Sequence, residues 1–274
     1  MVGTKTTKKP TKLYSRFEGD IFYGDALEFL NGIKDASADI VFLDPPFNLG
    51  KRYGRRSGKA DLLRQHDYIT FMEAVLRRSA VILKDGGALY LYHTPQWAYR
   101  FANVLEEALT FRHWIAISMK NGFVRGTSLY PAHYALLYFT RGKAAHFHRP
   151  KIEPSRCKHC KEFTKDYGGY KEFVKDGINL SDFWDDLSPV RHKKFKHRKS
   201  NELPLELPRR VVKVSGSRRG LLVDPFAGAG TSIIAAVEVG MRFKACDSVK
   251  SYCSLMQRRL QKWQSERSNG NAES

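Results

Sequence analysis

The chain has 274 residues, 42% of them hydrophobic, which is enough for one substantial domain with an insertion or for two small domains. Its 47 lysines and arginines outnumber 28 acidic residues and give a formal charge of +19, which favours a polyanionic partner over an ordinary solvated surface. No apolar run approaches the roughly 18 residues of a membrane span. Four cysteines in so long a chain do not indicate a disulfide framework, so we expect the protein in a reducing cytoplasm.

The apolar pattern alternates between strand and helix from residue 18 onward. Expected strands cover residues 20–25, 39–43, 88–92, 114–119, 134–140, 220–223 and 242–247. Expected helices cover residues 26–33, 68–83, 96–109, 205–214, 232–240 and 252–263. This alternation predicts an α/β fold, with a mostly parallel sheet and helices on both faces.

Three parts of the chain depart from this pattern. Residues 1–17 are expected to form a disordered basic arm, and residues 265–274 a disordered polar tail. Residues 146–200 are basic and show little apolar periodicity, so we expect a small inserted region there. The insertion divides a single α/β domain into residues 18–145 and 201–264.

An Asp-Pro-Pro-Phe turn follows the expected strand at residues 39–43. Two prolines fix two φ angles and remove two amide donors, so the Asp44 carboxylate and the Pro45 carbonyl form a rigid pair of acceptors. Such a pair matches the two N–H donors of an exocyclic base amine, and Phe47 can stack on a base removed from a duplex. An isolated Pro-Pro is more typical of a plain rigid turn. With an acid before it and an aromatic after it, the pattern favours a catalytic group of Asp44, Pro45, Pro46 and Phe47.

A glycine turn follows the expected strand at residues 220–223, with the sequence Phe226-Ala227-Gly228-Ala229-Gly230-Thr231. Glycine permits a close approach of the backbone, and amides at the start of the next helix can face a carboxylate or phosphate. Asp247 ends the following strand, where an acid can bind the two hydroxyls of a ribose. Taken alone, the glycine turn could equally be a turn required only for packing, and Asp247 could equally be the cap of the next helix. Together they fit S-adenosylmethionine, which carries a ribose and an amino-acid end, better than a dinucleotide.

These two motifs resemble those of the DNA amino-methyltransferases, which form N6-methyladenine or N4-methylcytosine. In that family an Asp/Asn/Ser-Pro-Pro-aromatic motif forms the catalytic pocket, and Phe-x-Gly-x-Gly binds S-adenosylmethionine. The catalytic motif comes first here, which is the order of the family's beta group. Phe47 stands where the family usually has tyrosine, so it keeps the stacking face and lacks the hydroxyl. Further similarity lies in Gly24-Asp25, Tyr130-Pro131-Ala132-His133 and Asn201-Glu202-Leu203-Pro204.

The resemblance implies a Rossmann-like, S-adenosylmethionine-dependent methyltransferase in which residues 146–200 recognise the target sequence. It assigns cofactor binding to Asp25, Phe226, Ala227, Gly228, Gly230, Thr231 and Asp247. The aspartate before Pro-Pro favours a site-specific enzyme that methylates adenine N6 of a flipped base in double-stranded DNA, in the cytoplasm at the nucleoid. Cytosine N4, an RNA substrate and a non-catalytic nucleic-acid-binding protein are the alternatives. A partner restriction endonuclease, and the choice between monomer and homodimer, stay open.

Two clusters of basic residues are expected to contact nucleic-acid phosphates. One follows the Asp-Pro-Pro-Phe turn and the other ends the inserted region. Their members are Lys51, Arg52, Arg55, Arg56, Arg191, Lys193, Lys194, Lys196, Arg198 and Lys199. A solvated loop is the alternative interpretation of the second cluster.

A pair of cysteines, Cys157 and Cys160, has the two-residue gap of half a zinc site. A tetrahedral site needs two more ligands, which could come from His146, His148, His192 and His197. The companion Cys-x-x-Cys is missing, and two unligated thiols in a basic loop are the alternative. If a metal binds this chain, the pattern predicts a structural zinc on Cys157 and Cys160.

Overall fold

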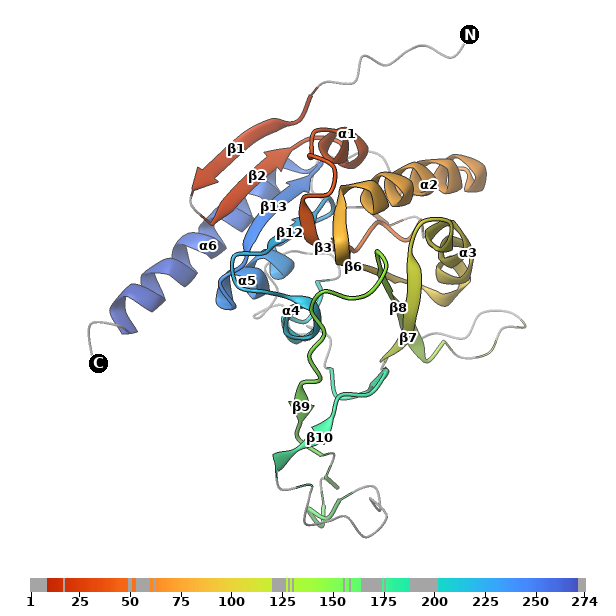
Figure 1. Ribbon diagram of the computed structural model, residues 1–274, viewed down its shortest axis with the longest axis vertical. Helices are drawn as coiled ribbons and strands as arrows, with labels where there is room; N and C mark the ends of the chain where they lie inside the picture. Colours follow the sequence, from red (N-terminus) through yellow and green to blue (C-terminus); the bar gives the residue numbers. More distant parts are fainter. Residues whose placement is uncertain are drawn as a thin grey trace.

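A central mixed sheet runs through the molecule (Figure 1). The computed structural model describes residues 9–16, 18–48, 51–52, 60–61, 63–119, 127, 129, 131–154, 156–157, 159–163, 174, 176–187 and 202–270. Within these ranges, nine strands form the sheet in the order β1-β2-β13-β12-β3-β6-β8-β7-β11. Their bounds are β1 Thr11–Arg16, β2 Gly19–Tyr23, β3 Ala38–Leu43, β6 Leu83–His93, β7 Thr110–Ser118, β8 His133–Thr140, β11 Phe183–Trp184, β12 Leu221–Asp224 and β13 Arg242–Asp247.

The centre of the sheet is parallel, as the alternation of strands and helices predicts. The neighbouring strands β2, β13, β12, β3 and β6 all run in one direction. β8 lies antiparallel between β6 and β7, while β1 is antiparallel to β2 at one edge and β11 is parallel to β7 at the other. The carboxyl ends of the central strands therefore meet at one edge, which is where open α/β sheets bind ligands.

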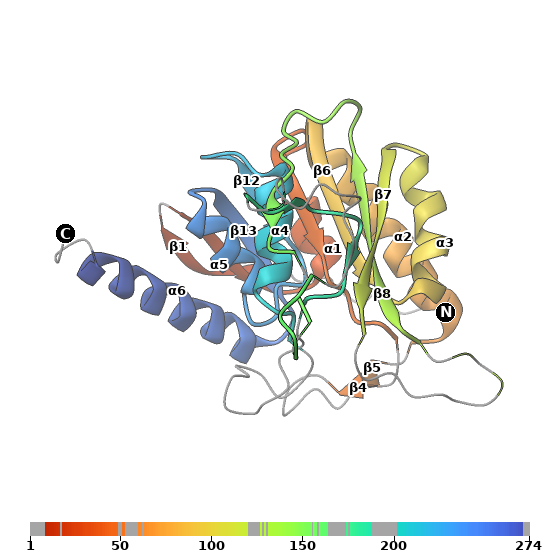
Figure 2. The ribbon, with the colours of Figure 1, turned by 90° about the horizontal axis from the view of Figure 1, so that it is seen from below.

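Helices cover both faces of this sheet (Figure 2). Their bounds are α1 Ala26–Asn31, α2 Gln65–Ile82, α3 Pro95–Glu106, α4 Glu206–Ser215, α5 Thr231–Glu238 and α6 Lys250–Gly270. The helices α1, α2 and α3 bury Leu30, Met72 and Phe101 against one face. On the other face, α4, α5 and α6 bury residues such as Val211 and Met256. None of the helices in the described ranges combines the length and apolarity needed to cross a membrane.

Strand β3 shows why the sequence folds in this way. Val41 and Leu43 belong to the core under α1, α2 and α3, whereas Ile40 and Phe42 belong to the core under α4 and α5. Both faces of the strand are buried, so it is apolar throughout instead of alternating, as is usual in a central parallel strand. Each such side chain contributes about 1.5–3 kcal/mol by leaving water.

The expectations for both ends of the chain are wrong in part. Strand β1 lies within the segment that the sequence predicts to be a disordered arm, yet it pairs with β2 because Leu13 and Tyr14 pack against the core. Helix α6 continues to Gly270, beyond the expected start of a disordered tail at residue 265. Lys262 and Glu266 form an i,i+4 ion pair there, which favours continuation of the helix.

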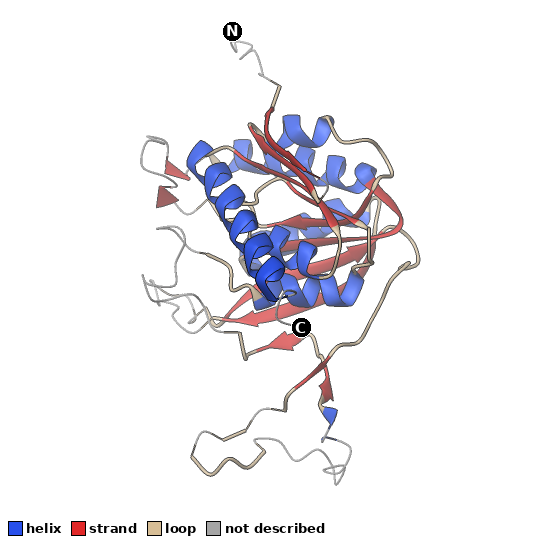
Figure 3. Ribbon diagram, turned by 90° about the vertical axis from the view of Figure 1, so that its left-hand side faces the viewer, coloured by secondary structure: helices blue, strands red, loops and turns tan. Residues whose placement is uncertain are grey.

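The inserted region is anchored to the sheet through Trp184. Strands β9 (Lys151–Ile152) and β10 (Ile178–Asn179) form a ribbon that extends away from the main sheet (Figure 3). Strand β11 returns to pair with β7, and Trp184 is 2% exposed in the core beneath α4. Arg210 of α4 lies over the Trp184 ring, 5.3 Å from its centroid, and forms an ion pair with Asp186.

Replacing Trp184 by alanine is expected to lower the free energy of unfolding by about 3–5 kcal/mol, because a buried indole leaves a cavity that the surroundings fill only in part. The neighbouring Phe183 is 52% exposed and provides the matched control. Phe183→Ala is expected to change stability by less than about 1 kcal/mol. Urea denaturation measures both variants, and equal losses would contradict the anchoring role of Trp184.

Candidate active site

Three aspartates lie at the carboxyl ends of adjacent parallel strands. Asp224 ends β12, Asp247 ends β13, and Asp44 directly follows β3. Since β12 lies between the other two strands, the Asp-Pro-Pro-Phe turn and the glycine turn meet at one edge of the sheet although they are far apart in the sequence.

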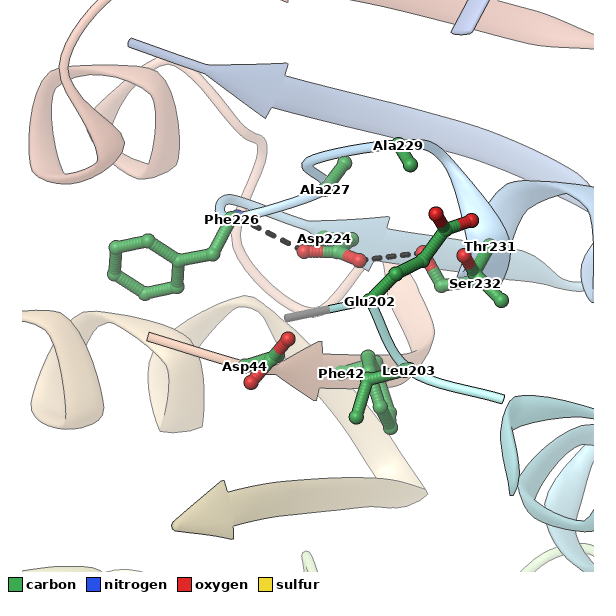
Figure 4. Close-up of a pocket in the computed structure, with 10 residues that line it drawn as sticks. All are labelled: Phe42, Asp44, Glu202, Leu203, Asp224, Phe226, Ala227, Ala229, Thr231 and Ser232. Carbon is green, nitrogen blue, oxygen red and sulfur yellow. Dashed lines mark hydrogen bonds between the residues drawn. The ribbon is translucent and has the colours of Figure 1, made fainter. Parts of the chain in front are cut away.

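A pocket opens between these strand ends (Figure 4). Its lining comes from three segments of the chain and consists of Phe42, Asp44, Glu202, Leu203, Asp224, Phe226, Ala227, Ala229, Thr231 and Ser232. Four of these were predicted as site residues from the sequence, namely Asp44, Phe226, Ala227 and Thr231. The catalytic motif and the cofactor motif therefore contribute to the same pocket.

The glycine turn is held from behind by Asp224, which is 2% exposed. Asp224 Oδ1 accepts a hydrogen bond from the Phe226 amide at 2.8 Å, and Oδ2 accepts one from Ser232 Oγ at 2.5 Å. Gly228 and Gly230 have φ angles of 53° and 77°, in the left-handed region that glycine enters without strain. The turn thus keeps the first residues of α5 at the pocket wall.

Asp247 and Asp25 both bind backbone amides. Asp247 Oδ2 accepts from the Gly228 amide at 2.9 Å, and Oδ1 accepts from the Val249 amide at 2.7 Å. Asp25 caps α1, because its Oδ1 accepts from two amides at the start of that helix at 2.9 and 3.1 Å. The Gly24 amide donates to the Asp247 carbonyl at 3.2 Å, so the two acids lie on neighbouring strand ends. Ribose contact by Asp247 and cofactor contact by Asp25 stay predictions.

Negative charge gathers at this edge of the sheet. Burial raises the pKa of Asp224 to about 7, and the charges of Asp44 and Asp247 add to that rise, while the hydrogen bonds that Asp224 accepts oppose it. Burial, followed by the charge of Asp44, also raises the pKa of Tyr92 and Tyr134. A site with this electrostatic character favours a positively charged ligand.

Glu202 and Arg259 form a buried ion pair beside the pocket that sequence reasoning missed. Arg259 Nη1 lies 3.3 Å from Glu202 Oε1 and donates to the Ala229 carbonyl at 2.7 Å, which ties α6 to the glycine turn. Glu202 is 8% exposed. The sequence marks it only through the Asn-Glu-Leu-Pro stretch. Arg259 could not be predicted, because an arginine on the polar side of a helix does not indicate which distant residue it contacts.

The Phe47 ring packs within a group of aromatic side chains. It is 8% exposed, and its centroid lies 4.8 Å from that of His93, 5.7 Å from that of Tyr134 and 5.8 Å from that of Tyr92. Tyr92 and Tyr134 lie near the ends of two neighbouring strands, β6 and β8, which the sequence pattern predicts as strands without indicating this contact. Stacking of Phe47 on a substrate ring stays a prediction.

Two of the residues predicted to contact phosphates, Lys51 and Arg52, lie in the part of the chain that the structure describes. Strand β4 (Lys51–Arg52) pairs with β5 (Ala60–Asp61). Asn48 closes the base of this loop, since its Nδ2 donates to the Leu63 carbonyl at 3.1 Å and its Oδ1 accepts from the Leu63 amide at 2.7 Å. The other members of both basic clusters lie outside the described residues, and these are Arg55, Arg56, Arg191, Lys193, Lys194, Lys196, Arg198 and Lys199.

The cysteine pair shows half of the ligands that a zinc site needs. Backbone hydrogen bonds from Cys160 and His159 lower the pKa of the Cys157 thiol, and the Lys161 amide donates to the Cys157 carbonyl at 3.0 Å. In the part of the chain that the structure describes, no three His, Cys, Asp or Glu side chains are grouped as metal ligands. His192 and His197, two of the expected partners, lie outside that part.

Comparison with known proteins identifies the family. A model of the DNA methylase family, which comprises N6 and N4 methyltransferases, matches residues 38–258. Type II methyltransferase M.BamHI of Bacillus amyloliquefaciens is 36% identical over 244 residues, or 88% of this chain, and the chain spans 57% of the length of M.BamHI. The chain therefore belongs to the DNA methylase family, as the two motifs predict.

Two solved structures share its fold. The cytosine-N4-specific PvuII DNA methyltransferase has a TM-score of 0.64 at 14% identity, covering 91% of this chain and 88% of that one. TTHA0409 of Thermus thermophilus, complexed with S-adenosyl-L-methionine, has a TM-score of 0.57 at 22% identity, covering 88% of this chain and 93% of that one. These likenesses confirm the predicted Rossmann-like methyltransferase fold.

The buried Asp224 carboxyl predicts a pH-dependent stability. Its pKa is about 7 in the folded chain, against about 3.9 for an unperturbed aspartate. The folded state therefore binds more protons at this group, so the contribution of Asp224 to the free energy of unfolding is greatest below about pH 4 and falls by roughly 4 kcal/mol as the pH rises from there to above 7.

Asp224→Asn mimics the protonated carboxyl and cannot ionise, so this component of the pH dependence is expected to disappear. Urea denaturation of both proteins at pH 5 and pH 8 gives the difference. The same loss of stability in both proteins would show that Asp224 does not titrate in this range.

Proposed function

We propose that this chain is a site-specific methyltransferase, which transfers a methyl group from S-adenosylmethionine to the exocyclic amine of a base in double-stranded DNA. The observation that carries the proposal is the shared pocket, to which Asp44 of the proline turn and Phe226 and Thr231 of the glycine turn contribute. Membership of the DNA methylase family and the formal charge of +19 support DNA as the substrate.

The pocket suits S-adenosylmethionine in charge and in backbone shape. Asp44, Glu202 and Asp224 line it with carboxyl groups, which favour a ligand that carries a sulfonium and an ammonium. The left-handed Gly228 and Gly230 let the backbone approach the ligand closely. When bound, the sulfonium supplies an electrophilic methyl group. The structure of TTHA0409, which shares the fold, was solved in complex with this compound.

Asp44 and the Pro45 carbonyl hold the amine of the flipped base. They accept its two N–H donors and turn the nitrogen lone pair toward the methyl group, so alignment supplies much of the catalysis. Asp44 also balances the positive charge that develops on the nitrogen as it attacks. Phe47 and Tyr134 form an aromatic wall on which the ring of the base rests.

Adenine N6 is the acceptor that Asp44 predicts, and cytosine N4 is the alternative. Both amines present two N–H donors and a lone pair delocalised into the ring, so the acceptor pair matches either. The fold likeness to a cytosine-N4-specific enzyme keeps the alternative open. The likeness to M.BamHI, a type II methyltransferase, supports a role in restriction–modification, in the cytoplasm beside a cognate endonuclease.

A structural zinc on Cys157 and Cys160 is a separate part of the proposal. The two thiols share one turn, and the amides that donate to Cys157 favour its thiolate form. Metal analysis of the purified chain decides it, with one zinc ion per chain expected and none after Cys157→Ser.

Incubation with labelled S-adenosylmethionine and duplex DNA, followed by mass spectrometry of the nucleosides, is expected to yield a single methylated amine. Asp44→Ala is expected to reduce the rate by at least about 10²-fold, because it removes an acceptor aimed at the transition state. Cofactor affinity, measured by calorimetry, is expected to fall far less than the rate, because Glu202 and Asp224 still line the pocket with carboxyl groups.

The nucleosides also separate the alternatives. Detection of N6-methyladenine would support adenine N6 as the acceptor, and detection of N4-methylcytosine would show that the acceptor is cytosine N4. Preferred methylation of RNA would overturn the choice of DNA. A wild-type chain that binds DNA and transfers no methyl group to either polymer would overturn the enzyme assignment.

A further inference from the structure

Two buried residues, Tyr68 of α2 and His93 at the end of β6, lie directly behind the proline turn. Tyr68 is 2% exposed and His93 is 0% exposed. The Tyr68 hydroxyl lies 2.6 Å from the Pro46 carbonyl oxygen and 2.7 Å from His93 Nε2. The three groups therefore form a continuous hydrogen-bonded chain that ends on the Asp-Pro-Pro-Phe motif.

The groups around His93 determine which atom donates in each of these hydrogen bonds. The Thr94 amide donates to His93 Nδ1 at 2.8 Å, and a backbone N–H can only donate, so Nδ1 carries the lone pair. Burial lowers the pKa of His93 to about 3, so the ring is neutral and its proton is on Nε2. Nε2–H must then donate to the Tyr68 oxygen, and the single Tyr68 O–H must donate to the Pro46 carbonyl.

Aromatic packing holds both rings in place. The Tyr68 ring lies edge-on to Trp97 at 4.9 Å and to Phe101 at 6.0 Å between centroids. The His93 ring also lies beside those of Trp97 and Phe101, and its centroid is 4.8 Å from that of Phe47. Helix α3 thus supports the pair, and the pair touches the motif at two successive residues.

We propose that Tyr68 and His93 are positioning residues, which lock the proline turn so that Asp44 and the Pro45 carbonyl keep the geometry required by the methyl acceptor. This inference rests on the proposed function. The two prolines fix φ at residues 45 and 46, and Pro46 also restricts ψ of Pro45 to the extended region, so ψ of Pro46 is the angle that the sequence leaves free. The hydrogen bond from Tyr68 fixes the Pro46 carbonyl and hence this remaining angle.

The hydrogen bonds from His93 through Tyr68 to Pro46 also give the two proline carbonyls different roles. The Pro46 oxygen faces the buried Tyr68 hydroxyl, whereas Asp44 lines the pocket, so we assign the substrate amine to Asp44 and the Pro45 oxygen. Neither Tyr68 nor His93 belongs to the pocket lining, so Tyr68 acts through the backbone of the motif, and His93 acts through Tyr68 and the Phe47 ring. A positioning role of this kind affects the rate of the chemical step more than the binding of either substrate.

The test is the Tyr68→Phe variant, with Tyr90→Phe as the matched control. Tyr90 is 1% exposed, lies on the same strand as His93, and its hydroxyl is 2.7 Å from Ser215 Oγ, away from the motif. Tyr68→Phe is expected to lower kcat by roughly 10- to 100-fold while KM for DNA and for S-adenosylmethionine stays within about twofold. Tyr90→Phe, which also loses one buried hydroxyl, is expected to keep kcat within about threefold.

An unchanged kcat in Tyr68→Phe, with wild-type activity intact, would overturn the inference and leave the proposed function standing. A matched drop in kcat in Tyr90→Phe would also overturn it, because general loss of packing would then explain the effect. A wild-type chain inactive on DNA would instead overturn the proposed function.

A second measurement uses the wild-type chain and does not depend on the folding of a variant. Nitrogen-15 NMR of the histidine rings, with the His93 signal assigned by its loss in His93→Gln, is expected to show a neutral ring protonated on Nε2 at pH 7. A ring protonated on Nδ1, or a charged ring, would overturn the hydrogen bonding from His93 through Tyr68 to Pro46.

Discussion

The site depends on the parallel pairing of β12 between β3 and β13. The register places Val223 beside Val41 on one side and Asp224 beside Ala245 on the other. A slip of one residue would turn each side chain of this short, buried strand to the opposite face of the sheet. The pairing therefore decides whether the turn after β3 and the turn after β12 face one pocket.

The two turns use the backbone in opposite ways. Prolines remove donors from the first turn and leave it rich in acceptors, which suits an amine. Glycines in the second let the chain approach a ligand and present the start of α5. Each turn is held in place by hydrogen bonds with one buried residue. Asp224 accepts hydrogen bonds from the glycine turn, and Tyr68 donates one to the proline turn.

Much of the fold could be predicted because each central element carries its own local signal. The apolar runs and helical periodicity placed most of the long strands and helices within a few residues. The antiparallel β1 was missed because its pattern is polar, and its reason to be ordered lies in contacts of Leu13 and Tyr14 with distant residues. The extension of α6 was missed because polar composition alone does not separate a solvated helix from a disordered tail.

The residues of the site also fall into those that the sequence predicts and those that it does not. Asp44 and the glycine turn were predicted because their residue types are unusual after a buried strand. Glu202 with Arg259, and Tyr68 with His93, could not be, since each pair joins elements far apart in the sequence and its members are ordinary for their positions. The sequence thus predicts residues whose types are unusual for their place in the chain, and it misses residues whose role depends on contacts between distant elements.

The most direct test of this account is a crystal structure of the chain with a non-reactive analogue of S-adenosylmethionine and duplex DNA that contains the target sequence. The account predicts an extruded base whose amine nitrogen lies about 3 Å from both the Asp44 carboxylate and the Pro45 carbonyl. The analogue should sit against the glycine turn, with its reactive end toward that nitrogen. A base that contacts neither acceptor, or an analogue bound away from the glycine turn, would contradict it.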